Sequence, residues 1–378
     1  MKRICYITTT SYAIRAFFIE QLKYLSNNGF DVSVICSKDF KLYEDLGENV
    51  RYIPLDMPRG VNILNSIKSV ISLIRLLKIE QFDFIQYSTI NAAIYASIAS
   101  FITGTKIRVY HMMGLRFVGL HGIAKFITKF FERLVCIFST HIDCVSKSCM
   151  EVAITNKIFN PKKGYIVWNG SSSGVNLLKF DITKKLLWRK EIRGKFKILD
   201  CDIVYGFVGR ITKDKGIDEL LQAFKYLNIQ NTKLLIVGDF ESQQNLNQDL
   251  LTWAFSNKNI IFHKSVTDIE KYYASFDVLV LPSYREGLPT VIIEAQAMGV
   301  PVIISDIPAA NDSMIKNKTG LVVRTKDPIN LSQGMAAMSN NEKRLANGKS
   351  GFHFVKENFD SIILCNKILE CKELLLKY

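Results

Sequence analysis

A glycine and two cations after an expected strand are the first residues in the sequence that suggest chemistry. The strand is predicted over 203–208, Gly209 and Arg210 follow it, and Lys215 comes just before a predicted helix. Gly209 allows a tight turn, and the start of the following helix offers free amides and a positive dipole end. Arg210 supplies a planar fork for phosphate oxygens and Lys215 a point charge. The segment therefore predicts an anion site, with a solvated basic turn as the alternative.

A second cluster surrounds the start of a helix predicted over 289–298, where Pro289 suits the first helical position. Glu286 lies in the preceding loop and Glu294 one turn into the helix. The helix start presents the amides around Leu288 to Val291 to an anion. Two carboxylates beside an anion site suit a ligand that also carries hydroxyls, one for a ribose diol and one for a hexose. The alternative is a pair of surface glutamates.

Short apolar runs alternate with helical patterns along the whole chain, which predicts an α/β fold with parallel sheets covered by helices on both faces. In the first half, strands are expected over 3–8, 31–36, 50–54, 83–88, 106–111, 141–145 and 164–168. In the second half, they are expected over 203–208, 233–237, 260–262, 277–281, 301–305 and 320–323. Ligands bind at the carboxyl ends of strands in such sheets, which is where the loop after 203–208 falls.

The segment from Asn169 to Gly174 is the most linker-like part of the chain, since it contains two glycines and nothing apolar. We therefore expect a first domain over 1–175 and a second over 176–357. An amphipathic C-terminal segment, 358–378, is expected to form a helix that crosses back onto the first domain.

Composition and charge limit the classes of protein that the chain can represent. A hydrophobic content of 48% with 22% charged residues is typical of a globular protein. Eight cysteines form no CxxC pair, which disfavours zinc or disulfides and favours free thiols in a reducing cytosol. Residues 1–180 carry +10 of the formal net charge of +14, which suggests that the first half meets something anionic.

The N-terminus has no signal-peptide pattern, and the longest uncharged stretch, 84–105, is interrupted by polar residues. We interpret that stretch as a strand and a buried helix. The expected location is therefore the cytoplasm.

The two clusters together resemble glycosyltransferase family 4, whose members are retaining enzymes of the GT-B fold. The resemblance rests on Phe207-Val208-Gly209-Arg210 with Lys215-Gly216, and on Glu286-Gly287-Leu288-Pro289 with Glu294-Ala295. The first half is similar to the branch that builds bacterial capsule, exopolysaccharide and O-antigen chains, notably at Gly114-Leu115-Arg116-Phe117. The GT-B fold implies two Rossmann-like domains that face each other across a cleft, the first binding the acceptor and the second the donor nucleotide.

The resemblance also implies roles for individual residues. Arg210 and Lys215 would bind the donor diphosphate, and Gly209 would form the turn beside it. Glu294 would take the ribose hydroxyls, while Glu286 and residues 287–290 would hold the transferred sugar and phosphate. No metal and no cofactor beyond the donor sugar nucleotide is expected.

The sequence departs from the family pattern in the first half. Relatives often carry a glycine-rich loop after the first strand, but Thr8 to Ala13 contains no glycine. Met113 stands where relatives often have His, and His111 lies two residues earlier. On a strand, His111 would point to the same side as Met113. His111 is therefore a candidate catalytic residue, with an ordinary strand-end histidine as the alternative.

The expected reaction is transfer of a hexose or N-acetylhexosamine, from a UDP-sugar by subfamily resemblance, to a polyprenyl-diphosphate-linked saccharide. The segment from Leu115 to Thr140 predicts a basic amphipathic helix for contact with the cytoplasmic face of the plasma membrane. Its apolar stripe consists of Ile123, Phe126, Ile127, Phe130, Phe131, Leu134, Val135 and Phe138. Lys125, Lys129 and Arg133 recur on another face. The alternative is a helix that packs on the sheet of its own domain.

Two other classes of protein stay open. A nucleotide-sugar epimerase of similar two-domain fold shares the logic of donor binding but not this pair of motifs. A basic nucleic-acid-binding protein needs a basic face with stacking aromatic residues, whereas most of the 24 Phe and 15 Tyr fall in apolar patterns. Nucleic acid is therefore not an expected partner.

Overall fold

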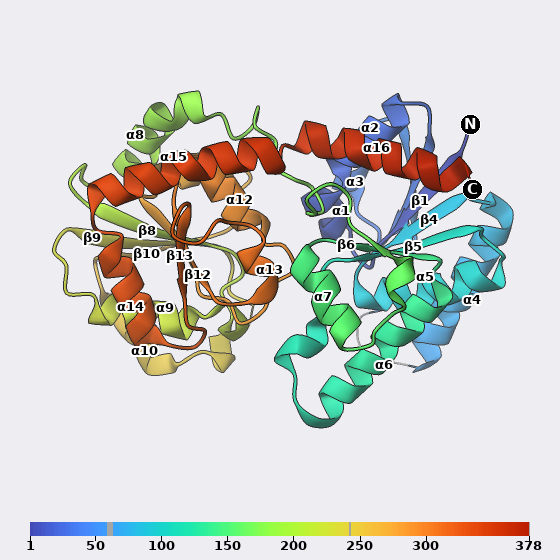
Figure 1. Ribbon diagram of the computed structural model, residues 1–378, viewed down its shortest axis with the longest axis horizontal. Helices are drawn as coiled ribbons and strands as arrows, with labels where there is room; N and C mark the ends of the chain where they lie inside the picture. The colour runs from blue at the N-terminus through green and yellow to red at the C-terminus, as the bar shows by residue number, and fades with distance from the viewer. Residues whose placement is uncertain (59–62, 242, 378) are drawn as a thin grey trace. The chain divides into compact units, whose positions relative to one another are not determined.

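The computed structural model describes residues 1–58, 63–241 and 243–377 (Figure 1). Tyr378, the last residue of the predicted C-terminal segment, lies outside the described residues. Contacts divide the chain into two compact units. The first unit comprises Met1–Ser173 and Ser361–Tyr378, and the second comprises Gly174–Asp360.

The first unit is built on a parallel sheet of seven strands in the order β3-β2-β1-β4-β5-β6-β7. The strands are β1 (Arg3–Ile7), β2 (Asp31–Cys36), β3 (Val50–Pro54), β4 (Phe84–Tyr87), β5 (Ile107–Met112), β6 (His141–Cys144) and β7 (Gly164–Tyr165). They are short and mostly apolar on both faces, as expected for strands that helices cover on either side.

Helices cover both faces of this sheet. They are α1 (Ser11–Phe17), α2 (Ile19–Asn27), α3 (Phe40–Leu46), α4 (Ile63–Glu80), α5 (Ile90–Ile102), α6 (Gly122–Phe138), α7 (Lys147–Thr155) and α16 (Ser361–Lys377). One buried cluster joins the sheet to α1–α3 and α16, and a second joins it to α4–α7. Figure 1 shows α16 beside α2, so the C-terminal helix packs on the first unit, as predicted.

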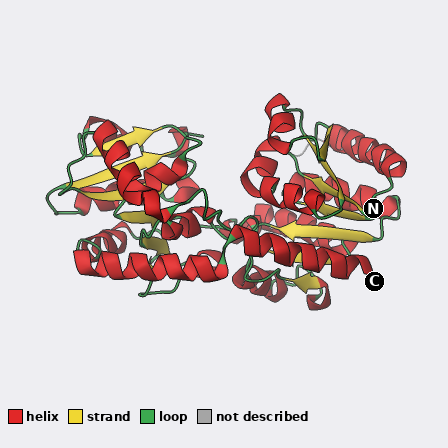
Figure 2. Ribbon diagram, turned by 90° about the horizontal axis from the view of Figure 1, so that it is seen from above, coloured by secondary structure: helices red, strands yellow, loops and turns green. Residues whose placement is uncertain are grey.

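The second unit repeats the plan with a parallel sheet of six strands in the order β10-β9-β8-β11-β12-β13. The strands are β8 (Ile203–Val208), β9 (Thr232–Val237), β10 (Ile260–His263), β11 (Val278–Leu281), β12 (Val302–Ser305) and β13 (Gly320–Val323). The helices are α8 (Lys185–Lys195), α9 (Ile217–Tyr226), α10 (Gln248–Ser256), α11 (Ile269–Ser275), α12 (Thr290–Ala297), α13 (Pro308–Asn311), α14 (Pro328–Ala337) and α15 (Asn341–Asn358). Figure 2 shows strands layered between helices in each unit.

The predicted α/β class with parallel sheets is confirmed, but one local prediction is wrong. The strand expected over 164–168 ends at Tyr165, and Trp168 adopts a φ of 53° that a strand does not allow. The linker-like segment contains the division between the two units, after Ser173. It is nevertheless packed: Ser171 and Ser172 are buried, and a Cβ on Gly170 would lie 2.2 Å from the Val145 carbonyl oxygen.

Within the described ranges, no helix combines the length and apolarity needed to cross a membrane.

Candidate functional site

The two motifs meet because the strand order of the second sheet reverses between β8 and β11. These strands are neighbours in the sheet, although β9 and β10 separate them in sequence. In open α/β sheets, ligands bind beyond the carboxyl ends of the strands at the point where the strand order reverses. Gly209 and Arg210 follow β8, and the segment from Pro282 to Pro289 follows β11. The fold thus brings both motifs to the expected ligand position.

Gly216 allows these two loops to touch. Its φ of +72° is left-handed, and a Cβ at this position would lie only 2.1 Å from the carbonyl oxygen of Pro282. A larger residue would push the loops apart. The Tyr284 amide also donates to the Asp214 carbonyl at 2.9 Å, so the contact is fixed by backbone on both sides.

Side chains join the loops a second time. Lys215 Nζ donates to Glu286 Oε1 at 2.6 Å, and the two side chains are only 17% and 11% exposed. Arg285 pairs with Asp214 at 3.0 Å. Burial alone would raise the pKa of the Asp214 carboxyl, but the Thr212 hydroxyl and nearby cations, including Arg285, hold it below its usual value. Lys215 and Glu286, predicted from separate motifs, therefore form one partly buried ion pair.

Arg210 lies at the exposed rim of this arrangement. Its guanidinium pairs with Glu241, and both side chains are more than half exposed. The backbone behind it is close-packed, since a Cβ on Gly238 would lie 1.9 Å from the Gly209 carbonyl oxygen. Gly209 itself has a φ of +147°, which suits the turn predicted for it. Because an exposed ion pair contributes little to stability, Arg210 can exchange Glu241 for a more strongly charged anion.

Helix α12 begins one residue later than predicted. Pro289 is the residue before the first helical position, and its ψ of 111° is extended instead of helical. The first amides of a helix have no partner inside it, so the backbone from Gly287 to Thr290 leads into an end that attracts anions. Among the described residues, the Ser283 hydroxyl is buried beside this loop without a hydrogen-bond partner.

Glu294 sits in a different environment from Glu286. The Tyr273 hydroxyl donates to Glu294 Oε2 at 2.8 Å. Burial raises the pKa of the Glu294 carboxyl above its usual value, and the Tyr273 hydrogen bond and the charge of Lys179 oppose that rise. Tyr273 packs on Phe180 with ring centroids 6.0 Å apart. The two glutamates are therefore not equivalent: one neutralises a lysine and the other lies against aromatic rings.

His111 belongs to the first unit, at the carboxyl end of β5. Its Nδ1 is 2.8 Å from Asp143 Oδ2 and its Nε2 is 2.9 Å from Ser172 Oγ. The side chain is buried. A proton on Nδ1, directed at the Asp143 carboxyl, would leave Nε2 as an acceptor for the Ser172 hydroxyl.

Helix α6 exposes the first part of its apolar stripe. Ile123, Phe126 and Phe130 are 78%, 71% and 53% exposed, whereas Val135 is fully buried. Two of the three predicted membrane-facing cations have another role. Lys129 donates to the Asn156 side chain, and Arg133 donates to the Asn156 and Lys157 carbonyls, where both offset the C-terminal end of α7.

Sequence reasoning missed the residues that connect the motifs. Asp214, Arg285 and Tyr273 hold the site together, yet each looks like an ordinary surface or core residue in the sequence. Asp214 and Arg285 lie inside the two motif loops, and that position was the sequence signal that could have identified them as site residues. In the described ranges, no group of three or more His, Cys, Asp or Glu side chains is placed to hold a metal ion.

Two families of known proteins match the chain, one over each half. The family described as "Glycosyl transferases group 1" matches residues 189–354. The family described as "Glycosyl transferase 4-like" matches residues 3–146. The first match includes both motifs of the second unit.

Individual relatives match most of the chain. A "Capsular polysaccharide biosynthesis glycosyltransferase CapM" of Staphylococcus aureus is 31% identical over 372 residues, covering 97% of this chain and 96% of its own. A "UDP-Gal:alpha-D-GlcNAc-diphosphoundecaprenol alpha-1,3-galactosyltransferase" of Escherichia coli is 28% identical, covering 82% of this chain and 80% of its own.

Solved structures share the fold at low identity. A glycosyltransferase from Rickettsia africae superimposes with a TM-score of 0.82 at 20% identity, over 100% of this chain and 99% of its own. The Anabaena protein Alr3699/HepE in complex with UDP gives a TM-score of 0.79 at 16% identity, over 99% and 100% of the two chains.

Proposed function

The chain belongs to glycosyltransferase family 4, and we propose that it transfers a hexose or N-acetylhexosamine from a UDP-sugar to a polyprenyl-diphosphate-linked saccharide, with retention of anomeric configuration. The observation that carries this proposal is the joining of the two motif loops at the strand-order reversal of the second sheet. There, Lys215 pairs with Glu286 in the loop that leads into α12, and Arg210 follows β8 at the same edge of the sheet. Two cations and the first amides of a helix are the groups that a diphosphate requires.

For this reaction, the site must stabilise the nucleoside diphosphate as it leaves the sugar. As the bond between the sugar and the diphosphate breaks, its electron pair stays on the phosphate oxygen and negative charge grows there. Lys215, Arg210 and the backbone from Gly287 to Thr290 would offset that charge, which lowers the barrier without a metal ion. The acceptor oxygen forms the new glycosidic bond at the anomeric carbon, and the proton of its hydroxyl passes to the departing phosphate oxygen.

The two glutamates fit different parts of the donor. Glu286 keeps the Lys215 ammonium in place through the 2.6 Å contact, and its second oxygen would accept a hydroxyl of the transferred sugar. Glu294, beside Tyr273, would accept the ribose hydroxyls. The E. coli relative's name specifies UDP-Gal as donor, and a structural neighbour was solved with UDP, which supports a uridine nucleotide here.

His111 is proposed to contact the sugar substrate. Its ring is oriented by Asp143, and its Nε2 partner, Ser172, is a hydroxyl that a sugar hydroxyl resembles chemically. The role of His111 would be to position a sugar hydroxyl that takes the place of the Ser172 hydroxyl on Nε2.

The products of the reaction test the proposed function. The protein is incubated with a panel of sugar nucleotides and a short-chain polyprenyl-diphosphate saccharide, with EDTA present. We expect nucleoside diphosphate release and a lengthened lipid-linked saccharide, with the donor anomer retained in its NMR spectrum. An epimerase would instead yield an altered free sugar nucleotide without nucleoside diphosphate. That result, or activity that requires added magnesium or manganese, would contradict the proposal.

We further propose that α6 rests on the cytoplasmic face of the plasma membrane, where a lipid-linked acceptor is held. The support is the exposure of Ile123, Phe126 and Phe130 beside Lys125, on the more basic half of the chain. An amphipathic surface with nearby cations binds anionic interfaces through apolar burial and charge together.

Vesicle flotation tests the membrane contact. Replacing Ile123, Phe126 and Phe130 with Ser is expected to lower recovery with phosphatidylcholine–phosphatidylglycerol vesicles by about tenfold, because most of the buried apolar area is lost. The matched control replaces Leu186, Leu187 and Leu345, which are 80%, 66% and 66% exposed in the second unit, and should float like the wild type. Equal recovery of all three proteins would contradict the contact.

A further inference from the structure

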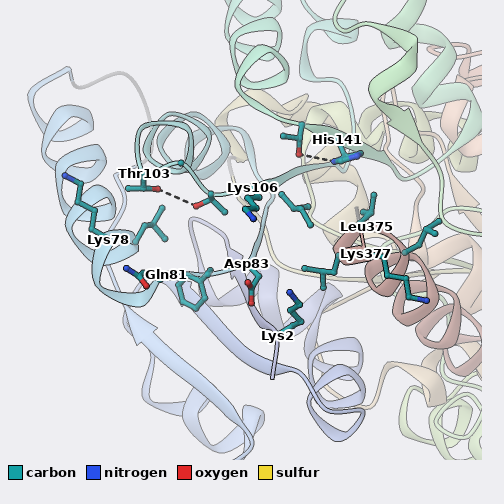
Figure 3. A pocket seen from close by; sticks show the side chains of 17 residues that line it. Lys2, Lys78, Gln81, Asp83, Thr103, Lys106, His141, Leu375 and Lys377 are labelled. Atoms are coloured by element: carbon teal, nitrogen blue, oxygen red, sulfur yellow. Dashed lines mark hydrogen bonds between the residues drawn. The ribbon is translucent and has the colours of Figure 1, made fainter.

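A cavity of about 890 Å³ lies at the opposite edge of the first sheet from the carboxyl ends of its strands. Its lining comes from the residues that precede β1, β4, β5 and β6 and from the last turns of α4 and α16. Figure 3 shows Lys78 and Gln81 on one side of the cavity, Leu375 and Lys377 on the other, and Lys106 between them. Its volume lies within the range of small-molecule sites, about 300–1,000 Å³.

Four lysines line this cavity: Lys2, Lys78, Lys106 and Lys377. All four are exposed, and none of their side chains has a hydrogen-bond or ion-pair partner among the described residues. Lys78 and Lys377 also offset the C-terminal ends of α4 and α16. Lys2 and Lys106 precede strands, so they have no such role.

The charge of these lysines is not balanced locally. Asp83 is the only carboxylate among the described residues that line the cavity, and its Oδ2 already accepts the Arg3 amide at 2.8 Å. Other cations of this edge are engaged: Arg108 donates to the Phe138 and Thr105 carbonyls, and Lys163 donates to three carbonyls after and within α6. The four free ammonium groups therefore give the cavity a net positive charge.

The wall of the cavity is partly apolar. Leu77, Phe82 and Ile107 line it and are buried, and Leu375 and Leu376 of α16 complete the apolar part. His141 also lines it, and burial together with the charge of Lys163 lowers the pKa of its imidazole, so it adds a neutral hydrogen-bonding group. A ligand for this cavity must therefore carry negative charge and an apolar portion together.

We propose that this cavity binds a phosphate-bearing amphiphile, with the phosphate among Lys2, Lys78, Lys106 and Lys377 and the apolar portion against Leu77, Phe82 and Leu375. The phosphate comes either from an anionic lipid headgroup or from a soluble organic phosphate. The site lies away from the carboxyl ends of the strands and involves no residue of the proposed donor site. The proposal is therefore independent of the proposed function.

Calorimetry with hexyl phosphate and with inorganic phosphate tests the site. Wild type is expected to bind hexyl phosphate about tenfold or more tightly than inorganic phosphate, because each buried methylene adds affinity. The variant Lys78→Glu, Lys106→Glu, Lys377→Glu should bind hexyl phosphate about tenfold or more weakly, since three attractive charges become repulsive. The same positions changed to Gln should give an intermediate loss. Thermal unfolding should show both variants folded, with the Glu variant melting somewhat lower because Lys78 and Lys377 offset helix C-terminal ends.

Two controls make the result specific. The variant Lys258→Glu, Lys318→Glu, Lys349→Glu changes net charge equally on exposed positions of the second unit and should bind hexyl phosphate as the wild type does. The double variant Arg210→Ala, Lys215→Ala should also retain it, which excludes binding at the donor site. Equal hexyl phosphate binding by wild type and the Lys78, Lys106, Lys377 variant would overturn the proposal, as would equal affinity for inorganic phosphate.

Vesicle sedimentation distinguishes the two sources of phosphate. With α6 unchanged, a loss of binding to phosphatidylcholine–phosphatidylglycerol vesicles in the Lys78, Lys106, Lys377 variant would identify a lipid headgroup. Unchanged vesicle binding with lost hexyl phosphate binding would identify a soluble organic phosphate. Both results support the site and differ only in its natural ligand.

Discussion

Replacing Lys215 with alanine is expected to lower kcat by about 10²–10³-fold while the protein stays folded. The ammonium acts on charge that grows as the diphosphate leaves, so its contribution is larger in the transition state than in the bound donor. The substitution also leaves Glu286, only 11% exposed, without the cation that it contacts at 2.6 Å, which places an uncompensated carboxylate beside the donor phosphates. Steady-state kinetics with a saturating donor measures the effect.

Lys213 provides the matched control for this prediction. It lies two residues earlier on the same loop, is exposed, and has no ion-pair partner among the described residues. Lys213→Ala should keep kcat within about twofold of the wild type, and Lys215→Arg should recover part of the activity because it restores charge but not shape. A Lys215→Ala enzyme with near-normal kcat would remove Lys215 from the reaction.

Replacing Gly216 with alanine is the second change with a large expected effect. The new Cβ would lie 2.1 Å from the Pro282 carbonyl oxygen, in a backbone conformation with a φ of +72°. A left-handed alanine costs about 1–2 kcal/mol before any clash, and the clash must separate the two loops that carry Lys215 and Glu286. A displacement of about 1 Å at a reacting centre can cost about 10²-fold in rate. We therefore expect activity to fall about 10²-fold or more and the melting temperature to fall as well.

The substitution Gly29→Ala is the control that separates the effect of backbone strain from the effect of moving the two loops apart. Its φ of +89° is also left-handed, but a Cβ there would meet nothing within 4 Å. Gly29→Ala should cost some stability and leave kcat and the affinity for UDP unchanged. If Gly216→Ala and Gly29→Ala lowered activity alike, the loss would reflect general destabilisation, and the close contact of the two loops would have no specific role.

The positions of the strands and of both motifs follow from local patterns in the sequence. The strands predicted over 203–208 and 320–323 have the same first and last residues in the structure, because short runs rich in β-branched residues determine their own ends. The motifs after β8 and β11 are visible as residues, and the rule that ligands bind at carboxyl ends predicts their shared edge. Strand order is then enough to make them neighbours.

The contacts inside the site depend on tertiary structure that no local pattern contains. Lys215 and Glu286 are 71 residues apart along the chain, and only the packing of their two loops brings them together. The close contact of Gly216 with the Pro282 carbonyl depends on the same packing. The same holds for Ser172, which looked like linker and proved to be the buried partner of His111. The lysines around the cavity come from four separate segments, so their grouping is invisible in the sequence.

A crystal structure of the protein with UDP tests the central proposal, that the donor binds where β8 and β11 diverge. We expect the diphosphate within hydrogen-bond distance of Lys215 Nζ and the backbone between Gly287 and Thr290. We also expect that Arg210 has turned from Glu241 toward the diphosphate and that the ribose lies on the Glu294 carboxyl. A diphosphate bound in the first unit, or one in the second unit without contact to Lys215 or the start of α12, would contradict the proposal.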